Sequence, residues 1–275
     1  MVNINNLSFS YSNTLVFREL TMKLEAGKIY GLLGQNGVGK TTLLKIMAGL
    51  LKVGDNTCEI SGRIPFRREP AFLSDMYFIP EDFVGPDMVV NQYAKNRGEF
   101  YPKYDDGKFK QLLAEFEVDG TKRFTRLSFG QQKKAILAFA LSVNTKLLLM
   151  DEPSNSLDIP SKTQFRKAMA QSANDESCIV ISTHQVRDLE NLIDPIVILD
   201  NNGLILNESI ERISEKLIFR LTTKIEEQAI YNEPTLGGYI TVDENYDKEE
   251  SKVSLEALFN ATLQNKERIM NLFNK

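Results

Sequence analysis

The segment G-Q-N-G-V-G-K-T-T, residues Gly34 to Thr42, decides the fold of this chain of 275 residues. A short apolar run, K-I-Y-G-L-L at Lys28–Leu33, precedes it, and Lys40–Leu51 follows with leucine and methionine side chains on one helical face. Strand, glycine-rich turn and helix occur in this order in a phosphate-binding P-loop. A chance glycine-rich turn is the alternative, but the flanking elements favour the P-loop.

The glycine spacing in this segment has a mechanical reason. Glycines let the backbone amides point inward at an anion, and the helix that follows adds its positive amino-terminal end. Lys40 would place a charge toward the β- and γ-phosphates of a nucleotide, and the Thr41 hydroxyl would bind Mg²⁺. The residues expected to contact the nucleotide here are Gly34, Gln35, Asn36, Gly37, Val38, Gly39, Lys40, Thr41 and Thr42.

Two adjacent carboxylates, Asp151 and Glu152, follow a second apolar run, K-L-L-L-M at Lys146–Met150, which is expected to be a buried strand. A buried strand that ends in Asp-Glu delivers both groups to the carboxyl edge of the sheet, where α/β proteins bind ligands. Asp151 is expected to hold Mg²⁺, directly or through water, and Glu152 to polarise an attacking water. Strands also end in solvated acids without any such role, but the P-loop favours hydrolysis of a nucleotide.

The rest of the chain indicates an α/β core with an insertion. Val2–Phe9 alternates like a half-buried strand, and buried runs such as Cys178–Ser182 alternate with helical segments, as in a parallel sheet. The amino terminus is expected to form an antiparallel β region, and residues 82–145, approximately, an inserted helical subdomain. Residues 216–275 are expected to form a small carboxyl-terminal extension after a domain of residues 1–215. Further expected elements are helices at Val90–Phe100, Asp106–Phe116, Gln131–Ser142 and Ser161–Ala173, and strands at Ile196–Leu199 and Leu204–Leu206 around the turn signal Asn201-Asn202-Gly203.

Composition excludes several classes of protein. Hydrophobic residues make up 42% and charged residues 25%, as in a soluble globular protein, and 33 basic against 37 acidic residues leave a net charge of −4. This charge offers no basic footprint, so no nucleic-acid partner is expected. Cys58 and Cys178 lie in apolar contexts and are expected to be buried thiols. No secretory signal or long apolar stretch is visible, so we expect a cytoplasmic chain whose membrane role depends on a partner.

The ordered motifs resemble those of the nucleotide-binding subunit of ATP-binding-cassette (ABC) transporters, over roughly residues 1–212. Gly34–Thr42 is similar to the Walker A motif and Leu148–Glu152 to the Walker B motif of that family. Leu127–Gln131, L-S-F-G-Q, is similar to its signature, and Ser156-Leu157-Asp158 to its D-loop. These motifs follow one another in the order of the family.

Two single residues extend the resemblance. Tyr11 corresponds to the aromatic residue that stacks on adenine, and His184 to the switch histidine that contacts the γ-phosphate and orients the water. His184 is the only histidine in the chain, and a lone histidine usually has a structural role. Here it directly follows the apolar run C-I-V-I-S-T, at the same sheet edge as Glu152, which favours the functional interpretation.

The resemblance implies an ATPase that closes head-to-tail with a second copy over two Mg-ATP. One subunit would supply Tyr11, the P-loop and the catalytic group of Lys40, Glu152 and His184, and the other would supply Ser128, Gly130 and Gln131 of the signature. Ser128–Gln131 also fits a capping box that only begins a helix. The two interpretations are compatible, because a helix amino terminus is itself an anion site.

Three positions depart from the commonest family pattern. Phe129 replaces a glycine of the signature, and Ser156 stands where glycine is frequent in the D-loop. Glu81 occupies the place of the glutamine that senses Mg²⁺, so it is expected to contact the nucleotide. Its carboxylate would add negative charge beside the γ-phosphate, and its role is either to join Thr41 and Asp151 at the metal or to tune the site.

By resemblance, the chain would be the energy subunit of a transporter, held on the inner face of the cell membrane by a separate transmembrane permease. Tyr101–Phe109 and Ser254–Phe259 are similar to segments of bacterial exporter-type systems. The alternative is a soluble ABC ATPase acting on ribosomes or DNA, although such relatives usually carry two cassettes or long coiled coils. A P-loop kinase or GTPase fits poorly, since the chain has no N-K-x-D motif.

Overall fold

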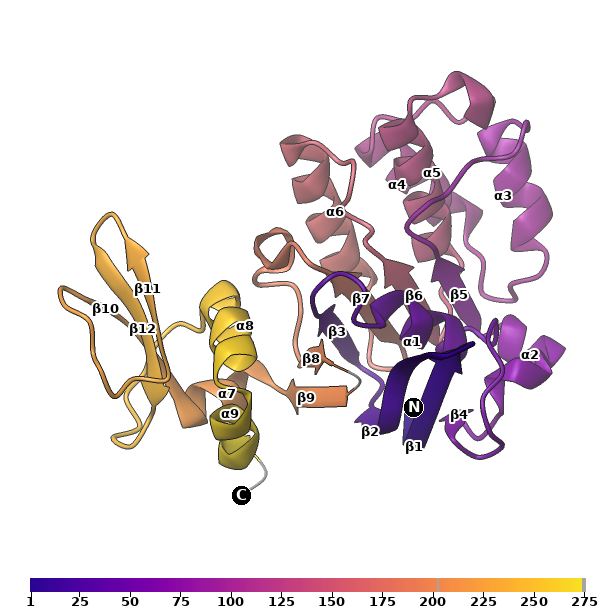
Figure 1. Ribbon diagram of the computed structural model, residues 1–275. Coiled ribbons are helices and arrows are strands. Elements are labelled where there is room, and N and C mark those ends of the chain that lie inside the picture. Colours follow the sequence, from indigo (N-terminus) through magenta and orange to yellow (C-terminus); the bar gives the residue numbers. More distant parts are fainter. Residues whose placement is uncertain (202, 274–275) are drawn as a thin grey trace.

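The computed structural model describes residues 1–201 and 203–273, and a mixed sheet lies at its centre (Figure 1). The strands of this sheet lie in the order β5-β6-β7-β3-β8-β9, and only β8 and β9 pair antiparallel. Their bounds are Met76–Ile79 (β5), Leu147–Asp151 (β6), Cys178–Thr183 (β7), Lys28–Leu33 (β3), Ile196–Asp200 (β8) and Gly203–Glu208 (β9). The α/β fold class expected from the sequence is confirmed.

Side chains of the central strands alternate between two hydrophobic cores. Leu149 of β6 belongs to one core together with α1 (Lys40–Met47), whereas its neighbour Met150 belongs to the other with α5 (Phe129–Ser142) and α6 (Ile159–Ser172). Because both faces of the sheet are covered, the inner strands are apolar throughout. This is why β3, β6 and β7 are recognisable in the sequence.

An antiparallel sheet at the amino terminus has the order β2-β1-β4. It consists of β1 (Val2–Tyr11), β2 (Thr14–Leu24) and β4 (Cys58–Ile60). This antiparallel region is confirmed, but β2 and β4 are not visible in the sequence pattern. The pairing of β1 with β2 contains register shifts, and each shift changes which face the following side chains point to.

Helices connect β5 to β6, as the insertion in the α/β core requires. They are α3 (Val90–Gly98), α4 (Asp106–Glu115) and α5, with the short α2 (Pro70–Leu73) before β5. Asp105 caps α4 by accepting a hydrogen bond from the backbone N–H of Lys108 at 2.9 Å. The ring of Phe139 on α5 packs edge-on against Tyr77 and Tyr93, which joins these helices to the sheet.

The carboxyl-terminal region is more ordered than the sequence indicates. After α7 (Ile210–Lys216), three strands form an antiparallel sheet in the order β10-β12-β11, and two helices follow. The bounds are Leu217–Thr222 (β10), Tyr231–Thr235 (β11), Gly238–Glu244 (β12), Leu255–Gln264 (α8) and Lys266–Phe273 (α9). Asn202, in the turn expected between β8 and β9, lies outside the described residues. Across the described part of the chain, no helix has the length and apolarity needed to cross a membrane.

Candidate functional site

The P-loop connects β3 to α1 through residues whose backbone demands glycine. Gly37 and Gly39 have φ angles of 83° and 109°, in the left-handed region where side chains are strained. A Cβ at Gly34 would lie 2.6 Å from a methyl group of Val38, so this turn has no room for a side chain. The loop therefore folds as the glycine spacing predicts.

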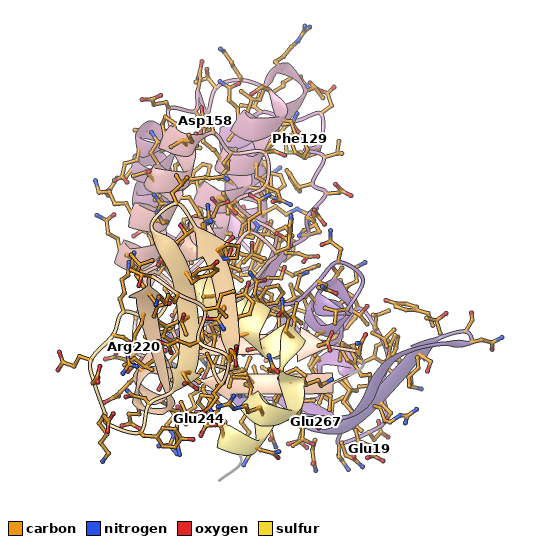
Figure 2. All side chains as sticks on the ribbon, turned by 60° about the vertical axis from the view of Figure 1, so that its left-hand side comes forward. Glu19, Phe129, Asp158, Arg220, Glu244 and Glu267 are labelled. Atoms are coloured by element: carbon orange, nitrogen blue, oxygen red, sulfur yellow. The ribbon has the colours of Figure 1, made fainter. Side chains whose placement is uncertain are left out.

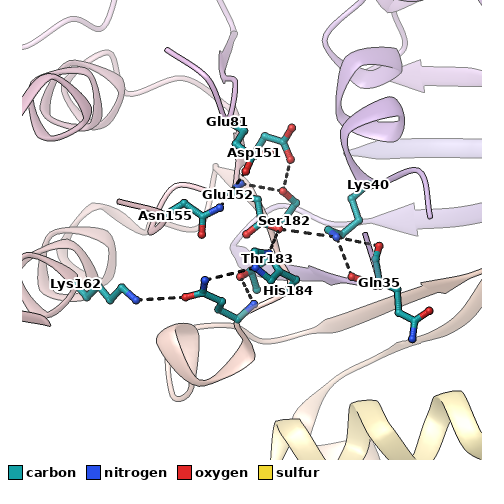
Figure 3. A network of polar contacts seen from close by, with 12 residues as sticks. Gln35, Lys40, Glu81, Asp151, Glu152, Asn155, Lys162, Ser182, Thr183 and His184 are labelled. Carbon is teal, nitrogen blue, oxygen red and sulfur yellow. Dashed lines mark hydrogen bonds and ion pairs between the residues drawn. The ribbon is translucent and has the colours of Figure 1, made fainter. Parts of the chain in front are cut away.

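A cavity of about 310 Å³ opens over this loop at the carboxyl edge of the sheet. Its lining joins the P-loop to residues far apart in the sequence: Asn36, Gly37, Gly39, Lys40, Thr41, Thr42, Glu81, Asp151, Glu152 and His184. Most of the candidate site residues thus share one cavity, and Figure 3 shows the acidic residues, Lys40 and His184 facing one another. Gly34, Gln35 and Val38 belong to the loop but do not line the cavity.

Lys40 is buried at the base of this cavity. Its Nζ donates to the carbonyl of Gly34 at 2.8 Å and to that of Gln35 at 3.3 Å, and it lies 3.9 Å from Glu152 Oε1. Burial lowers the pKa of Lys40, and the nearby carboxylates, Glu152 first, oppose this shift. The ammonium is held at the loop by hydrogen bonds to two carbonyls, which phosphate oxygens can replace.

Ser182 on β7 orders the acidic pair at the end of β6. Its hydroxyl donates to Asp151 Oδ1 at 2.5 Å and accepts from the backbone N–H of Glu152 at 3.1 Å. The sheet register places Ser182 directly beside Asp151. Sequence reasoning misses this residue, although its place in S-T-H, at the end of the strand that precedes His184, was a usable signal.

Glu152 and His184 form a pair suited to handling a proton. His184 Nδ1 lies 2.8 Å from Glu152 Oε1, and Glu152 is almost fully buried while His184 is partly exposed. The second carboxylate oxygen, Oε2, is buried and has no hydrogen-bond partner among the described residues. A buried carboxylate oxygen needs a partner, so this atom is placed to accept a proton from a bound water.

Glu81 completes the acidic lining. Its Oε1 accepts a hydrogen bond at 3.0 Å from the side-chain amide of Asn155, in the segment just after Glu152 (Figure 3). Asn155 is a second residue that sequence reasoning misses, because its partner lies 74 residues away.

The oxygen groups in the cavity fit Mg²⁺ bound together with phosphates. Thr41, Asp151 and Glu81 line the same space, and the described residues contain no cluster of three or more His, Cys, Asp or Glu that would hold a metal alone. Mg²⁺ usually keeps several waters and takes one or two protein carboxylates plus substrate phosphates. The donor set therefore matches a metal that arrives with a nucleotide.

The signature segment lies outside this cavity. Ser128 is the N-cap of α5: its hydroxyl accepts from Gln131 N–H at 3.3 Å, and Gln131 Oε1 accepts from Ser128 N–H at 3.1 Å, which is the expected capping box. A Cβ at Gly130 would lie 3.3 Å from the carbonyl of Ser156. Figure 2 shows Phe129 and Asp158 at the same end of the molecule. The signature and the Ser156–Asp158 segment thus form one exposed corner.

Tyr11 also lies apart from the cavity lining. It ends β1, is 44% exposed, and packs edge-on against Phe9 with ring centroids 5.0 Å apart. One part of the ring is thus exposed, and its stacking on adenine stays a prediction from the resemblance.

Comparisons with known proteins agree on one family. A family model described as ABC transporter matches residues 17–155. The ABC transporter ATP-binding protein YtrB of Bacillus subtilis is 26% identical over 220 residues, which are 79% of this chain and 75% of that protein. The energy-coupling factor transporter ATP-binding protein EcfA1 of Thermotoga maritima is 28% identical over 222 residues, and the match covers 78% of this chain and 84% of that protein.

A solved structure has the same fold. The structure of an ATP-binding subunit of an ABC transporter superposes with a TM-score of 0.70 at 22% identity, covering 78% of this chain and 91% of that one. The segment that the family model matches, residues 17–155, includes the P-loop, the signature segment and Glu152. The chain therefore belongs to the ABC transporter family, as one of its ATP-binding subunits, and is an ATPase.

Proposed function

We propose that two copies of this chain close head-to-tail around two Mg-ATP and drive a separate transmembrane permease. One observation carries the proposal: Lys40, Glu152 and His184 converge on one cavity, while Ser128 and Gly130 lie on an exposed corner outside it. Lys40, Glu152 and His184 would bind phosphate and water, but no residue of the signature lines the cavity of the same copy. A second copy, turned head-to-tail, brings the helix terminus at Ser128 to the phosphate that the first copy holds.

The residues of the cavity have different roles in ATP hydrolysis. The P-loop amides and Lys40 bind the phosphates, and Glu152 accepts a proton from the attacking water through its free oxygen. His184 orients the Glu152 carboxylate through the 2.8 Å contact and faces the γ-phosphate. When bound at Thr41, Asp151 and Glu81, Mg²⁺ would neutralise charge on the phosphates.

The transporter assignment draws on the relatives, which are named as ATP-binding proteins of transporters. We propose that residues 1–215 are the ATPase domain and residues 216–275 an extension, and that the permease holds the chain at the cytoplasmic face of the membrane. Export stays a prediction from the sequence. Purification of the tagged chain from membranes should recover a transmembrane protein; recovery with ribosomes or DNA instead would support the soluble alternative.

Replacing Ser128 by aspartate should abolish closure of the dimer but not binding of ATP by one copy. Aspartate is as good an N-cap as serine, so α5 is preserved, but its charge would face the γ-phosphate of the partner. Because like charges cost several kcal/mol, we expect hydrolysis to fall by about 100-fold or more. Light scattering with ATP measures the dimer and calorimetry measures binding by the monomer.

The matched control is Ser128→Thr, which keeps the hydroxyl and the cap and should retain most activity. A fully active Ser128→Asp variant would show that the signature corner does not meet a phosphate.

A further inference from the structure

Four charged side chains are buried among the residues that the structure describes, and one of them does not line the cavity. Lys40, Asp151 and Glu152 line the cavity, whereas Lys133, in the second turn of α5, does not. Lys133 is only 2% exposed. Burying an ammonium group is costly unless its hydrogen bonds and charge are compensated, so its contacts identify what it stabilises.

The ammonium of Lys133 holds the backbone that carries Glu81. Its Nζ donates to the carbonyl of Glu81 at 2.8 Å and to that of Pro80 at 3.4 Å. The adjacent Gln132 accepts from the backbone N–H of Gly85 at 3.0 Å. Two neighbouring side chains of α5 therefore fasten both ends of the segment from Pro80 to Gly85.

Close packing at Gly85 restricts the end of this segment. A Cβ at Gly85 would lie 2.4 Å from the ring of Phe124, so the backbone packs directly on that ring. At the other end, the Glu81 carboxylate is held by the Asn155 amide at 3.0 Å. The backbone of Glu81 is thus fixed by Lys133, and its side chain by Asn155.

The charge of Lys133 is compensated mainly by Glu81, which also supports a link between these two residues. Burial lowers the pKa of Lys133, and carboxylates oppose this shift, Glu81 most strongly and then Asp151. The cavity brings Glu81, Asp151 and Glu152 together at the place where phosphates are to bind. The buried ammonium of Lys133 attracts these carboxylates and so offsets part of their mutual repulsion, although Lys133 does not line the cavity.

We propose that Lys133 is a positioning residue that holds the Glu81 carboxylate at the Mg-ATP site through the backbone carbonyls of Pro80 and Glu81. It touches neither nucleotide nor metal and acts through Glu81. The proposal rests on the proposed function of the cavity, in which Glu81 contacts the metal or the phosphates.

A double-mutant cycle with Lys133→Met and Glu81→Ala tests the coupling. Methionine keeps an unbranched side chain of similar size and removes the charge and the donors. We expect Lys133→Met to lower both kcat and the affinity for Mg-ATP, measured by calorimetry, by about tenfold in the native background. In the Glu81→Ala background the same substitution should change either quantity by no more than about twofold.

Two further variants separate positioning from folding. Lys133→Arg keeps the charge and the donors and should restore binding and turnover to within about threefold. Lys134→Met, on the next position of α5, is the matched control, because Lys134 contacts Ser161 rather than the Pro80–Gly85 segment. We expect it to behave like the native chain.

Three outcomes of these experiments would overturn the proposal, and each has a different meaning. An equal loss from Lys133→Met in both backgrounds would show that Lys133 acts on the fold in general, and no loss in the native background would show that Glu81 needs no such support; either result overturns the proposal. If Glu81→Ala alone leaves Mg-ATP binding and turnover unchanged, the proposed role of Glu81 in the site fails, and the inference fails with it.

Discussion

Glu152→Gln should lower the rate of ATP hydrolysis by about 10²–10⁴-fold while leaving ATP binding intact. Glu152 is buried, with one oxygen on His184 and the other free of protein partners among the described residues. Glutamine has the same shape but cannot take a proton from water at neutral pH. Steady-state turnover measures the loss, and calorimetry shows whether ATP still binds.

The same variant should also accumulate as a dimer in the presence of Mg-ATP, because hydrolysis no longer removes the γ-phosphate that bridges the two copies. Glu211→Gln is a suitable control, since Glu211 is exposed on α7, remote from the cavity residues in sequence. Turnover of Glu152→Gln near the native rate would exclude Glu152 as the group that accepts the proton.

Lys40→Met should remove most ATP binding together with hydrolysis. The Lys40 ammonium lines the cavity and donates hydrogen bonds to the carbonyls of Gly34 and Gln35, which phosphate oxygens would replace. Losing a charged donor to a phosphate in a buried site costs about 100-fold or more in kcat/KM. Calorimetry with ATP and steady-state kinetics measure the two effects separately.

Methionine fills the volume of the lysine stem, so the P-loop backbone should persist and the melting temperature should change little. Lys45→Met, on the same helix, is the control: Lys45 is only partly buried and does not line the cavity. ATP binding by Lys40→Met at native affinity would contradict the role of Lys40 at the phosphates.

The sequence predicts best those elements that are buried on both faces. β3 matches its expected bounds, and β6 and β7 lie within one residue of theirs, because each is an unbroken apolar run. β2 escapes prediction because register shifts break its alternation, and β11, Y-N-E-P-T, because it is a short polar edge strand that contains proline. Such strands are defined by their neighbours rather than by their own pattern.

The site residues also fall into those that the sequence predicts and those that only the fold reveals. Lys40, Asp151, Glu152 and His184 stand at strand ends and loop positions that the sequence marks, and they line one cavity. Lys133 carries no local signal, and Ser182 has only its place in S-T-H, since each acts on a segment 30 or more residues away that folding brings close. Spacing predicts the groups that meet the nucleotide, and only the fold reveals those that hold them.

The central claim, that each ATP site is shared between two copies, is tested most directly by mixing two inactive variants. Glu152→Gln disables the cavity of its own copy, and Ser128→Asp disables the corner offered to the partner. In a mixed dimer one site combines both defects, while the other combines the intact cavity of one copy with the intact corner of the other. Mixed in equal amounts before ATP is added, the variants should regain hydrolysis. The upper limit is about a quarter of the native rate, because random pairing makes half of the dimers mixed and each mixed dimer has one intact site. The aspartate at the other site weakens closure but does not touch the intact site. A mixture no more active than the average of the two variants alone would contradict a shared site.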